Sequence, residues 1–461
     1  MPLPKILRPL QNTVQRVVNQ VATIMRPPRV ETHTADSIDT TLPPQLSAAI
    51  QELGAGPVSL KDVCVKATDV VTRLVGVGDP TGVVALSADR NGVLQWHVPG
   101  LGPVGKRQIA LVLQPKQLRS VGVFRFPRIQ DLTLDLVHQA EVSLKHATGL
   151  KKFPAPGQPL AGVPANFDAI KLTDHAPGGE LSLILIHGII DRVHGAAFLP
   201  LLLNPEYPRL FNHYGGRVFG FDHYTISETP LENAIQLLGL LPRNQTIDII
   251  CHSRGGLVTR CLLEHPEVRT TLKNKGVTIR RVVFVGAANQ GSPLARRENL
   301  IFLLSLLHNA HAQAARENGM EAGYLDKITK LIGAVAALAA GRIAQLPGVD
   351  ALVPNSKLIG ALNAASPGQM PQMFFVRANF GDSRPPLSVL EKIVKDVFKT
   401  ELNDLVVPFN GVADLRSRTP TPLIDCALDD LKTRQGRDWH LTYFKSERVL
   451  QFIVEHLTAA G

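Results

Sequence analysis

The stretch Ile247-Asp-Ile-Ile-Cys-His-Ser253-Arg-Gly-Gly-Leu-Val258 joins an apolar run directly to a helical pattern. The apolar run predicts a strand that is covered on both faces of a sheet. The two glycines that follow Arg254 predict a sharp turn, in which strand and helix approach closely. Such a turn lifts a serine hydroxyl above the sheet edge, and the helix N-terminus favours negative charge there. The stretch therefore indicates a nucleophile at Ser253.

The chain around this stretch alternates strands with helices. Such an alternation predicts the α/β fold class, as an open, doubly wound and mostly parallel sheet. We assign it to one domain at residues 168–461. The apolar runs that predict strands are Leu181–Ile186, Arg217–Phe221, Ile247–Cys251, Arg281–Val285 and Met373–Asn379, and helices are expected between them, as at Leu231–Leu240 and Gly255–Glu264.

The sequence Cys251-His-Ser-Arg-Gly-Gly resembles the nucleophile elbow of the α/β-hydrolases, and it is most similar to the lipase branch, which includes bacterial triacylglycerol lipases and esterases. Cys251 stands where that family usually has its first glycine, and cysteine is small enough for the turn. The resemblance covers roughly residues 175–458 and implies an α/β-hydrolase fold. The Arg254 side chain could contact an anionic substrate head group, but we favour a surface or salt-bridge role for it.

A second resemblance lies at Leu-Ser-Leu-Ile-Leu-Ile-His187-Gly188-Ile189-Ile190, an apolar run that ends in His-Gly. It is similar to the loop that supplies half of the oxyanion hole in that family. Backbone amides that are fixed in advance stabilise the tetrahedral oxyanion. The resemblance implies that the Ile189 and Arg254 amides are the two donors. His187, Gly188 and Gly255 would support this loop and the turn.

A third resemblance, at Val282–Ala295, is to the strand and Gly-Ser-Pro loop that follow the elbow in many bacterial lipases. Residues 296–365 then form a helical insertion that is rich in Leu, Ile and Ala. In that family such insertions cap the active site. An aliphatic cap favours apolar acyl chains and excludes water. A plain helical subdomain is the alternative.

The remaining members of a serine triad must follow in the order Ser, Asp, His. Asp404 in Leu402-Asn-Asp-Leu-Val-Val-Pro408 resembles the lipase Asn-Asp-Gly-x-Val-Pro loop, with Leu405 in place of glycine. Asp382 is the runner-up acid, and Asp425 is a third candidate. His440 lies before a final helix predicted at Ser446–Leu457, where the family places its histidine. His440 would be the general base and Asp404 would orient it.

The resemblance implies a serine ester hydrolase that acts through an acyl-enzyme, with no metal and no organic cofactor. The expected substrate is a carboxylic ester and, given the aliphatic insertion, a lipid ester. Acyl transfer or amide cleavage by the same triad stays open. The alternative from another class is an interaction or scaffold protein on a hydrolase fold, because fold does not fix function.

The first 167 residues follow other patterns. Residues 1–30 predict a basic amphipathic helix, which could dock on an anionic membrane through residues 9–26, on a partner, or on its own protein, or could act as a targeting peptide. Residues 31–55 suggest a linker, and residues 151–167 a proline-rich one. Between them, residues 56–150 predict a small β-rich domain. Its expected strands are Val83–Leu86, Val93–Val98, Gln108–Leu113 and Leu132–Leu136.

The composition of the 461 residues indicates a globular protein, with 44% hydrophobic and 19% charged residues. The formal net charge of +10 favours anionic partners, but no nucleic-acid motif is present, so we expect no nucleic-acid partner. Four cysteines without paired spacing favour a reducing compartment. With no signal peptide or spanning helix evident, we expect a cytoplasmic protein, in part peripheral at a membrane. The sequence does not give the oligomeric state.

Overall fold

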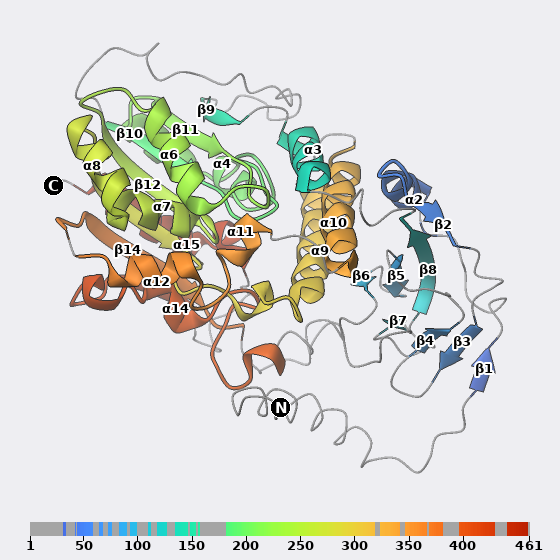
Figure 1. Ribbon diagram of the computed structural model, residues 1–461. Coiled ribbons are helices and arrows are strands. Elements are labelled where there is room, and N and C mark those ends of the chain that lie inside the picture. Colours follow the sequence, from blue (N-terminus) through green and yellow to red (C-terminus); the bar gives the residue numbers. More distant parts are fainter. Residues whose placement is uncertain are drawn as a thin grey trace, which may run out of the picture.

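The computed structural model describes a defined part of the chain, and helix and strand labels follow Figure 1. The predicted amphipathic helix at 1–30 lies outside this part. The described residues are 31–33, 42, 44–58, 64–67, 72–75, 83–89, 93–98, 109–111, 118–126, 134–145, 148–153, 155–156, 181–318, 323–341, 346–366, 368–380, 396–428 and 440–459.

A seven-stranded sheet forms the C-terminal part, in the order β15-β14-β13-β12-β10-β11-β9 (Figure 1). Strand β9 pairs antiparallel with β11, and the other neighbours are parallel. This sheet confirms the predicted α/β fold class. The strands are β9 (Gly149–Lys152), β10 (Leu181–Ile186), β11 (Val218–Asp222), β12 (Thr246–His252), β13 (Thr278–Val285), β14 (Gln372–Ala378) and β15 (Asp425–Leu428).

Helices flank this sheet, and several of them begin at a capping side chain or at a proline in the first turn. In α6, for example, Thr229 caps the helix: its hydroxyl accepts from the Glu232 amide, while the Glu232 carboxylate accepts from the Thr229 amide. Helix α7 packs against α6, α8 and α12, and α5 packs against α15. The helices are α4 (Leu199–Leu202), α5 (Tyr207–His213), α6 (Pro230–Leu240), α7 (Gly255–Glu264), α8 (Pro266–Asn274), α12 (Lys357–Ala364), α14 (Phe409–Ala413) and α15 (Glu447–Thr458).

The N-terminal part contains two antiparallel four-stranded sheets, in the orders β1-β3-β4-β7 and β2-β8-β5-β6. Two helices, α2 and α3, accompany them (Figure 1). The elements are β1 (Glu31–His33), α2 (Pro44–Gln51), β2 (Gly56–Pro57), β3 (Cys64–Ala67), β4 (Thr72–Val75), β5 (Val83–Asp89), β6 (Leu94–His97), β7 (Ile109–Leu111), β8 (Leu118–Arg125) and α3 (Leu134–Lys145).

The structure differs from the sequence interpretation at three places in this part. The stretch suggested as a linker, 31–55, contains α2, which is ordered because it buries Leu46, Ala49 and Ile50. A strand was expected at Leu132–Leu136, but its described residues, 134–136, lie at the start of α3, whose apolar residues recur at helical spacing. Strand β9 spans the boundary expected at residue 150 between the β-rich domain and the proline-rich linker, and it joins the large sheet, where Lys151 pairs with Gly220.

The insertion between β13 and β14 contains α9 (Leu300–Asn318), α10 (Tyr324–Gly341) and α11 (Pro347–Asp350). Figure 1 shows α9 and α10 between the large sheet and the N-terminal sheets. Helix α9 packs against β6, and α10 packs against α2, α3 and β5. Side chains of α9 extend the edge of β6, since Asn309 both accepts from the Leu94 amide and donates to its carbonyl.

Helix α10 is buried around much of its circumference. Its fully buried residues include Leu331, Ile332, Ala334, Val335, Ala336 and Ala337. A helix that is apolar on all sides is stable only when other elements cover it. Among the described residues, no helix is both long enough and apolar enough to cross a lipid bilayer.

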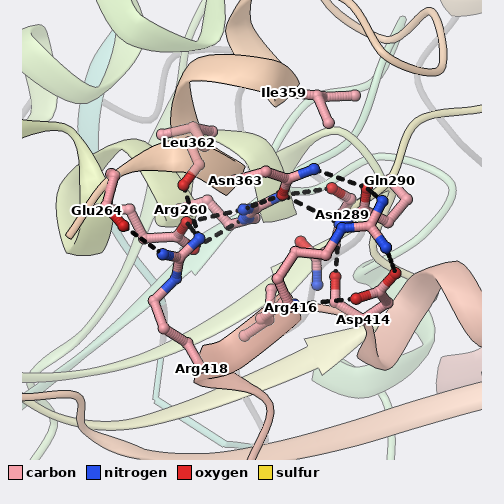
Figure 2. Close-up of polar contacts among 12 residues, drawn as sticks. Arg260, Glu264, Asn289, Gln290, Ile359, Leu362, Asn363, Asp414, Arg416 and Arg418 are labelled. Carbon is pink, nitrogen blue, oxygen red and sulfur yellow. Dashed lines mark hydrogen bonds and ion pairs between the residues drawn. The ribbon is translucent and has the colours of Figure 1, made fainter. Parts of the chain in front are cut away.

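A buried ionic cluster fixes α7 to the C-terminal segments (Figure 2). The Arg260 guanidinium donates to both oxygens of the Glu264 carboxylate, at 2.8 and 2.7 Å. Arg418 reaches the same carboxylate at 2.8 Å, and both Arg260 and Glu264 are fully buried. One carboxylate thus pairs with two guanidinium groups, and two of these three residues, Arg260 and Glu264, lie in the helix that follows Ser253.

Replacement of this carboxylate by an amide, in Glu264→Gln, is expected to destabilise the fold. It leaves Arg260 and Arg418 charged without their counter-ion, and loss of one partner of a buried ion pair costs about 3–5 kcal/mol. Urea unfolding measures the change. The matched control is Glu267→Gln at an exposed position on α8, which should change the free energy of unfolding only slightly. Equal effects of the two variants would contradict the prediction.

Candidate active site

Ser253 lies at the turn between β12 and α7, in the conformation that the sequence predicts. Its φ of 55° is in the left-handed region, which costs a non-glycine residue conformational energy. The strain is maintained by the surrounding structure: the Ser253 amide donates to Val285, and its carbonyl accepts from Ala288 and Gly256. The turn thus holds a strained serine at the carboxyl end of the sheet.

Glycines allow this turn to fit against its neighbours. A Cβ atom on Gly255 would lie 2.4 Å from the carbonyl oxygen of Ile186, and one on Gly188 would lie 2.7 Å from the Cβ atom of Ser253. Neither position has room for a side chain. The loop after β10 and the turn after β12 are therefore in direct contact, as the oxyanion-hole interpretation requires.

We expect Gly255→Ala to destabilise the protein by about 1–3 kcal/mol, because the added methyl group meets backbone atoms that cannot move aside. The matched control is Gly239→Ala in α6, where no atom lies within 4 Å of the added Cβ. That change should stabilise the protein by about 0.4–1 kcal/mol through the unfolded state. Thermal unfolding of the two variants checks the prediction. A Gly255→Ala variant as stable as the wild type would refute the close contact.

Asp404 and His440 form a buried hydrogen-bonded pair. The Nδ1 atom of His440 lies 2.8 Å from the Oδ2 atom of Asp404, and both side chains are 1% exposed. Because an ionised carboxylate only accepts, His440 must carry its proton on Nδ1. This leaves Nε2 with a lone pair, and Nε2 is buried with no hydrogen-bond partner among the described residues.

The loop around Asp404 holds the carboxylate in place. The amides of Val406 and Val407 donate to Oδ1 at 3.0 and 2.6 Å, and the Tyr443 hydroxyl donates to Oδ2 at 2.8 Å. Leu405 adopts a φ of 74°, the conformation for which glycine is suited. That backbone geometry accounts for the glycine in the lipase motif that this loop resembles. Here Leu405 adopts it, and its amide donates to the Asn403 side chain.

The surroundings favour the ionised form of Asp404. Burial acts to raise the pKa of this carboxyl, but the positive charge available on His440 and the hydrogen bonds from His440, Val407 and Val406 outweigh it. The net result is a pKa below the ordinary value. Asp404 can therefore fix the His440 tautomer and stabilise an imidazolium.

His252, which the sequence analysis did not assign, positions His440. Its Nε2 atom lies 2.8 Å from the His440 carbonyl oxygen, so Nε2 carries the proton and donates it. Burial and the charge of His440 lower the pKa of His252 to about 3, which keeps it neutral. The ring centres of His252 and His440 lie 4.8 Å apart. The sequence shows that His252 precedes Ser253, but it does not show that His252 hydrogen-bonds to the His440 carbonyl.

The loop after β10 is held by its own side chains. The Nδ1 atom of His187 lies 2.8 Å from the Gly188 carbonyl oxygen and donates to it. In a trans peptide the carbonyl and the amide point in opposite directions, so this bond also aims the Ile189 amide. The Nε2 atom of His187 accepts from the His223 amide at 3.3 Å. His187 therefore supports the loop from inside the protein.

The interpretation of Arg254 as a surface residue was wrong. It is fully buried, and its guanidinium donates to the Asn233 side chain at 2.8 Å and to the Glu228 carbonyl at 2.5 Å. A buried guanidinium needs such acceptors because desolvation is costly. The Arg254 side chain is therefore turned away from solvent and binds the loop after β11.

The structure brings some predicted site residues together and leaves others apart. Asp404 contacts His440, and His440 contacts the residue before Ser253. Asp425 lies in β15 and is paired with Arg377 at 2.6 Å. The runner-up acid, Asp382, lies outside the described residues.

Together, the sheet order and the strained strand–turn–helix at Ser253 define a protein of the α/β-hydrolase fold. The chain belongs to the family described as domain of unknown function DUF7379, whose model matches residues 162–458. A comparison with curated proteins found no match.

Solved structures with distant similarity were also found. Lipase 1 from Pelosinus fermentans is 12% identical with a TM-score of 0.42, over 61% of this chain and 99% of that one. Phospholipase PlaB from Legionella pneumophila is 14% identical with a TM-score of 0.31, over 51% of this chain and 46% of that one. A structure from a study of carboxylesterases of Nitrososphaera gargenis is 13% identical with a TM-score of 0.33, over 61% and 92%.

Proposed function

We propose that this protein is a serine hydrolase that cleaves carboxylic esters through an acyl-enzyme. Ser253 attacks the carbonyl carbon, and Nε2 of His440 takes the serine proton and returns it to the leaving group. Asp404 fixes the tautomer of His440. The amides of Ile189 and Arg254 stabilise the oxyanion. The observation that carries the proposal is the buried His440–Asp404 pair beside the strained turn of Ser253, with a His440 Nε2 atom that no described residue hydrogen-bonds.

We further propose lipid esters as the substrate class. The helical insertion packs against the loop that carries the proposed oxyanion donor, since the Arg192 guanidinium lies 4.5 Å from the ring centre of Tyr324 in α10. The side chains of the helical insertion are mostly aliphatic, and such a surface favours binding of an apolar acyl chain. The basic segment at residues 9–26 would bind an anionic membrane surface and so bring the enzyme to its substrate.

Labelling with a serine-directed fluorophosphonate, followed by peptide mapping, tests the proposed function. We expect the wild type to be labelled at Ser253 and the label to be lost in His440→Ala. Absence of labelling in folded wild type, also with detergent or vesicles present, would overturn the proposal and favour an interaction protein on a hydrolase fold. A series of esters with short and long acyl chains then tests the lipid preference.

A further inference from the structure

One acidic side chain of the N-terminal part is fully buried against the hydrolase part. Glu141 lies in α3, next to α10 in Figure 1, and it is 0% exposed. Its Oε1 atom accepts from the Thr225 amide at 2.6 Å, from the Thr225 hydroxyl at 3.0 Å and from the Ile226 amide at 3.0 Å. Its Oε2 atom accepts from the Ser227 amide at 2.9 Å and from the Ser227 hydroxyl at 2.6 Å. One carboxylate thus organises the loop at 225–227 with charge-assisted bonds.

This loop in turn holds the proposed oxyanion loop. The Thr225 hydroxyl donates a hydrogen bond to Glu141, and its oxygen accepts one from the Ile190 amide at 3.1 Å. Ile190 has a φ of 52°, which is strained for a β-branched residue. Such strain persists only where neighbours fix the backbone. Ile190 directly follows Ile189, the proposed donor. The backbone conformation next to this donor therefore depends on Thr225 and Glu141.

The residue that follows this loop, Glu228, also holds Arg254, whose amide is the second proposed donor. The Arg254 guanidinium donates to the Glu228 carbonyl at 2.5 Å and to the Gly348 carbonyl at 3.4 Å. The Gly348 amide in turn donates to the Ile226 carbonyl at 2.9 Å. Burial lowers the pKa of Arg254 to about 10, and the negative charge of Glu141 is the strongest influence that opposes this. Glu141 therefore acts on both sides of the proposed oxyanion hole.

We propose that Glu141 is a positioning residue for the oxyanion hole, through which the N-terminal part completes the site of the hydrolase part. The inference rests on the proposed function of Ser253. It assigns a role to the N-terminal part, which carries no motif for chemistry of its own. Glu141 does not touch the reacting atoms and acts through Thr225 and Arg254.

The first test is Glu141→Gln, which keeps the size of the side chain and places an NH₂ group against donors that need an acceptor. With a soluble short-chain ester, we expect kcat to fall about 10–100-fold with little change in KM, because a shifted oxyanion donor weakens transition-state binding alone. The matched control is Asp135→Asn, at an exposed position of the same helix, which should keep the wild-type kcat.

A readout that is independent of activity accompanies the kinetics. Hydrogen exchange of the peptide that spans residues 187–193 should accelerate in Glu141→Gln and not in Asp135→Asn, because the Ile190 amide loses its ordered acceptor. Wild type that fails to react with fluorophosphonate overturns the proposed function, whereas unchanged exchange in this peptide overturns the coupling itself.

A second pair of variants decides the matter if Glu141→Gln does not fold. Thr225→Val removes the hydroxyl that joins Glu141 to Ile190, while the Thr225 backbone amide still donates to Glu141. It should lower kcat and accelerate exchange at 187–193, and Thr225→Ser should restore both. Wild-type kcat and exchange in Thr225→Val would overturn the proposal.

Discussion

Ser253→Ala is expected to reduce ester hydrolysis by roughly 10⁶-fold in kcat, because removal of a serine nucleophile abolishes the acyl-enzyme route as a whole. The residual rate would come from binding and from oxyanion stabilisation. Alanine keeps the size of the turn residue, and the backbone of residue 253 retains its hydrogen bonds to Val285, Ala288 and Gly256. Steady-state kinetics on a soluble ester, together with fluorophosphonate labelling, measure the loss.

The control for this prediction is Ser446→Ala, which removes a serine at the start of α15 whose side chain makes no capping hydrogen bond. Its kcat and labelling should equal those of the wild type. Thermal unfolding should show both variants folded. A Ser253→Ala variant with substantial activity would show that the nucleophile is another group.

The second large effect is expected for Asp404→Asn, with a fall in kcat of about 10⁴-fold. The amides of Val406 and Val407 both donate to Oδ1, so the asparagine carbonyl oxygen must stay there. Its NH₂ group then faces Nδ1 of His440, which becomes an acceptor. The imidazole proton moves to Nε2, and His440 can no longer accept the serine proton.

Two controls separate this tautomer effect from other changes. Asp425→Asn alters the acid that is paired with Arg377, and Asp382→Asn alters the runner-up acid; both should keep most of the activity. Tyr443→Phe removes one donor to Asp404 without changing the tautomer, so its effect should be much smaller. Full activity in Asp404→Asn, or a comparable loss in Asp382→Asn, would show that the acid was misassigned.

Much of the large sheet could be predicted because most of its strands are separate, continuous runs of apolar residues. The strand predicted at Leu181–Ile186 coincides with β10, and those at β11, β12, β13 and β14 agree within a few residues. Each is an apolar run with buried side chains, and such runs carry a strong local signal. β9 and β15 were missed, because both are short strands at the sheet edges with polar residues among the apolar ones.

The sequence by itself determined the strand–turn–helix around Ser253, the α/β class, and Asp404 and His440 as a candidate pair. These features depend on apolar runs, small residues and motifs, all of which are formed by residues that are close together in the chain. Only the tertiary structure decided that His252 donates to the His440 carbonyl, that the Arg254 side chain is buried, and that Glu141 binds the loop at 225–227. Those contacts join residues that lie tens to hundreds of positions apart. A hydrogen bond depends on distance and direction in space, and spacing along the chain does not fix either of them.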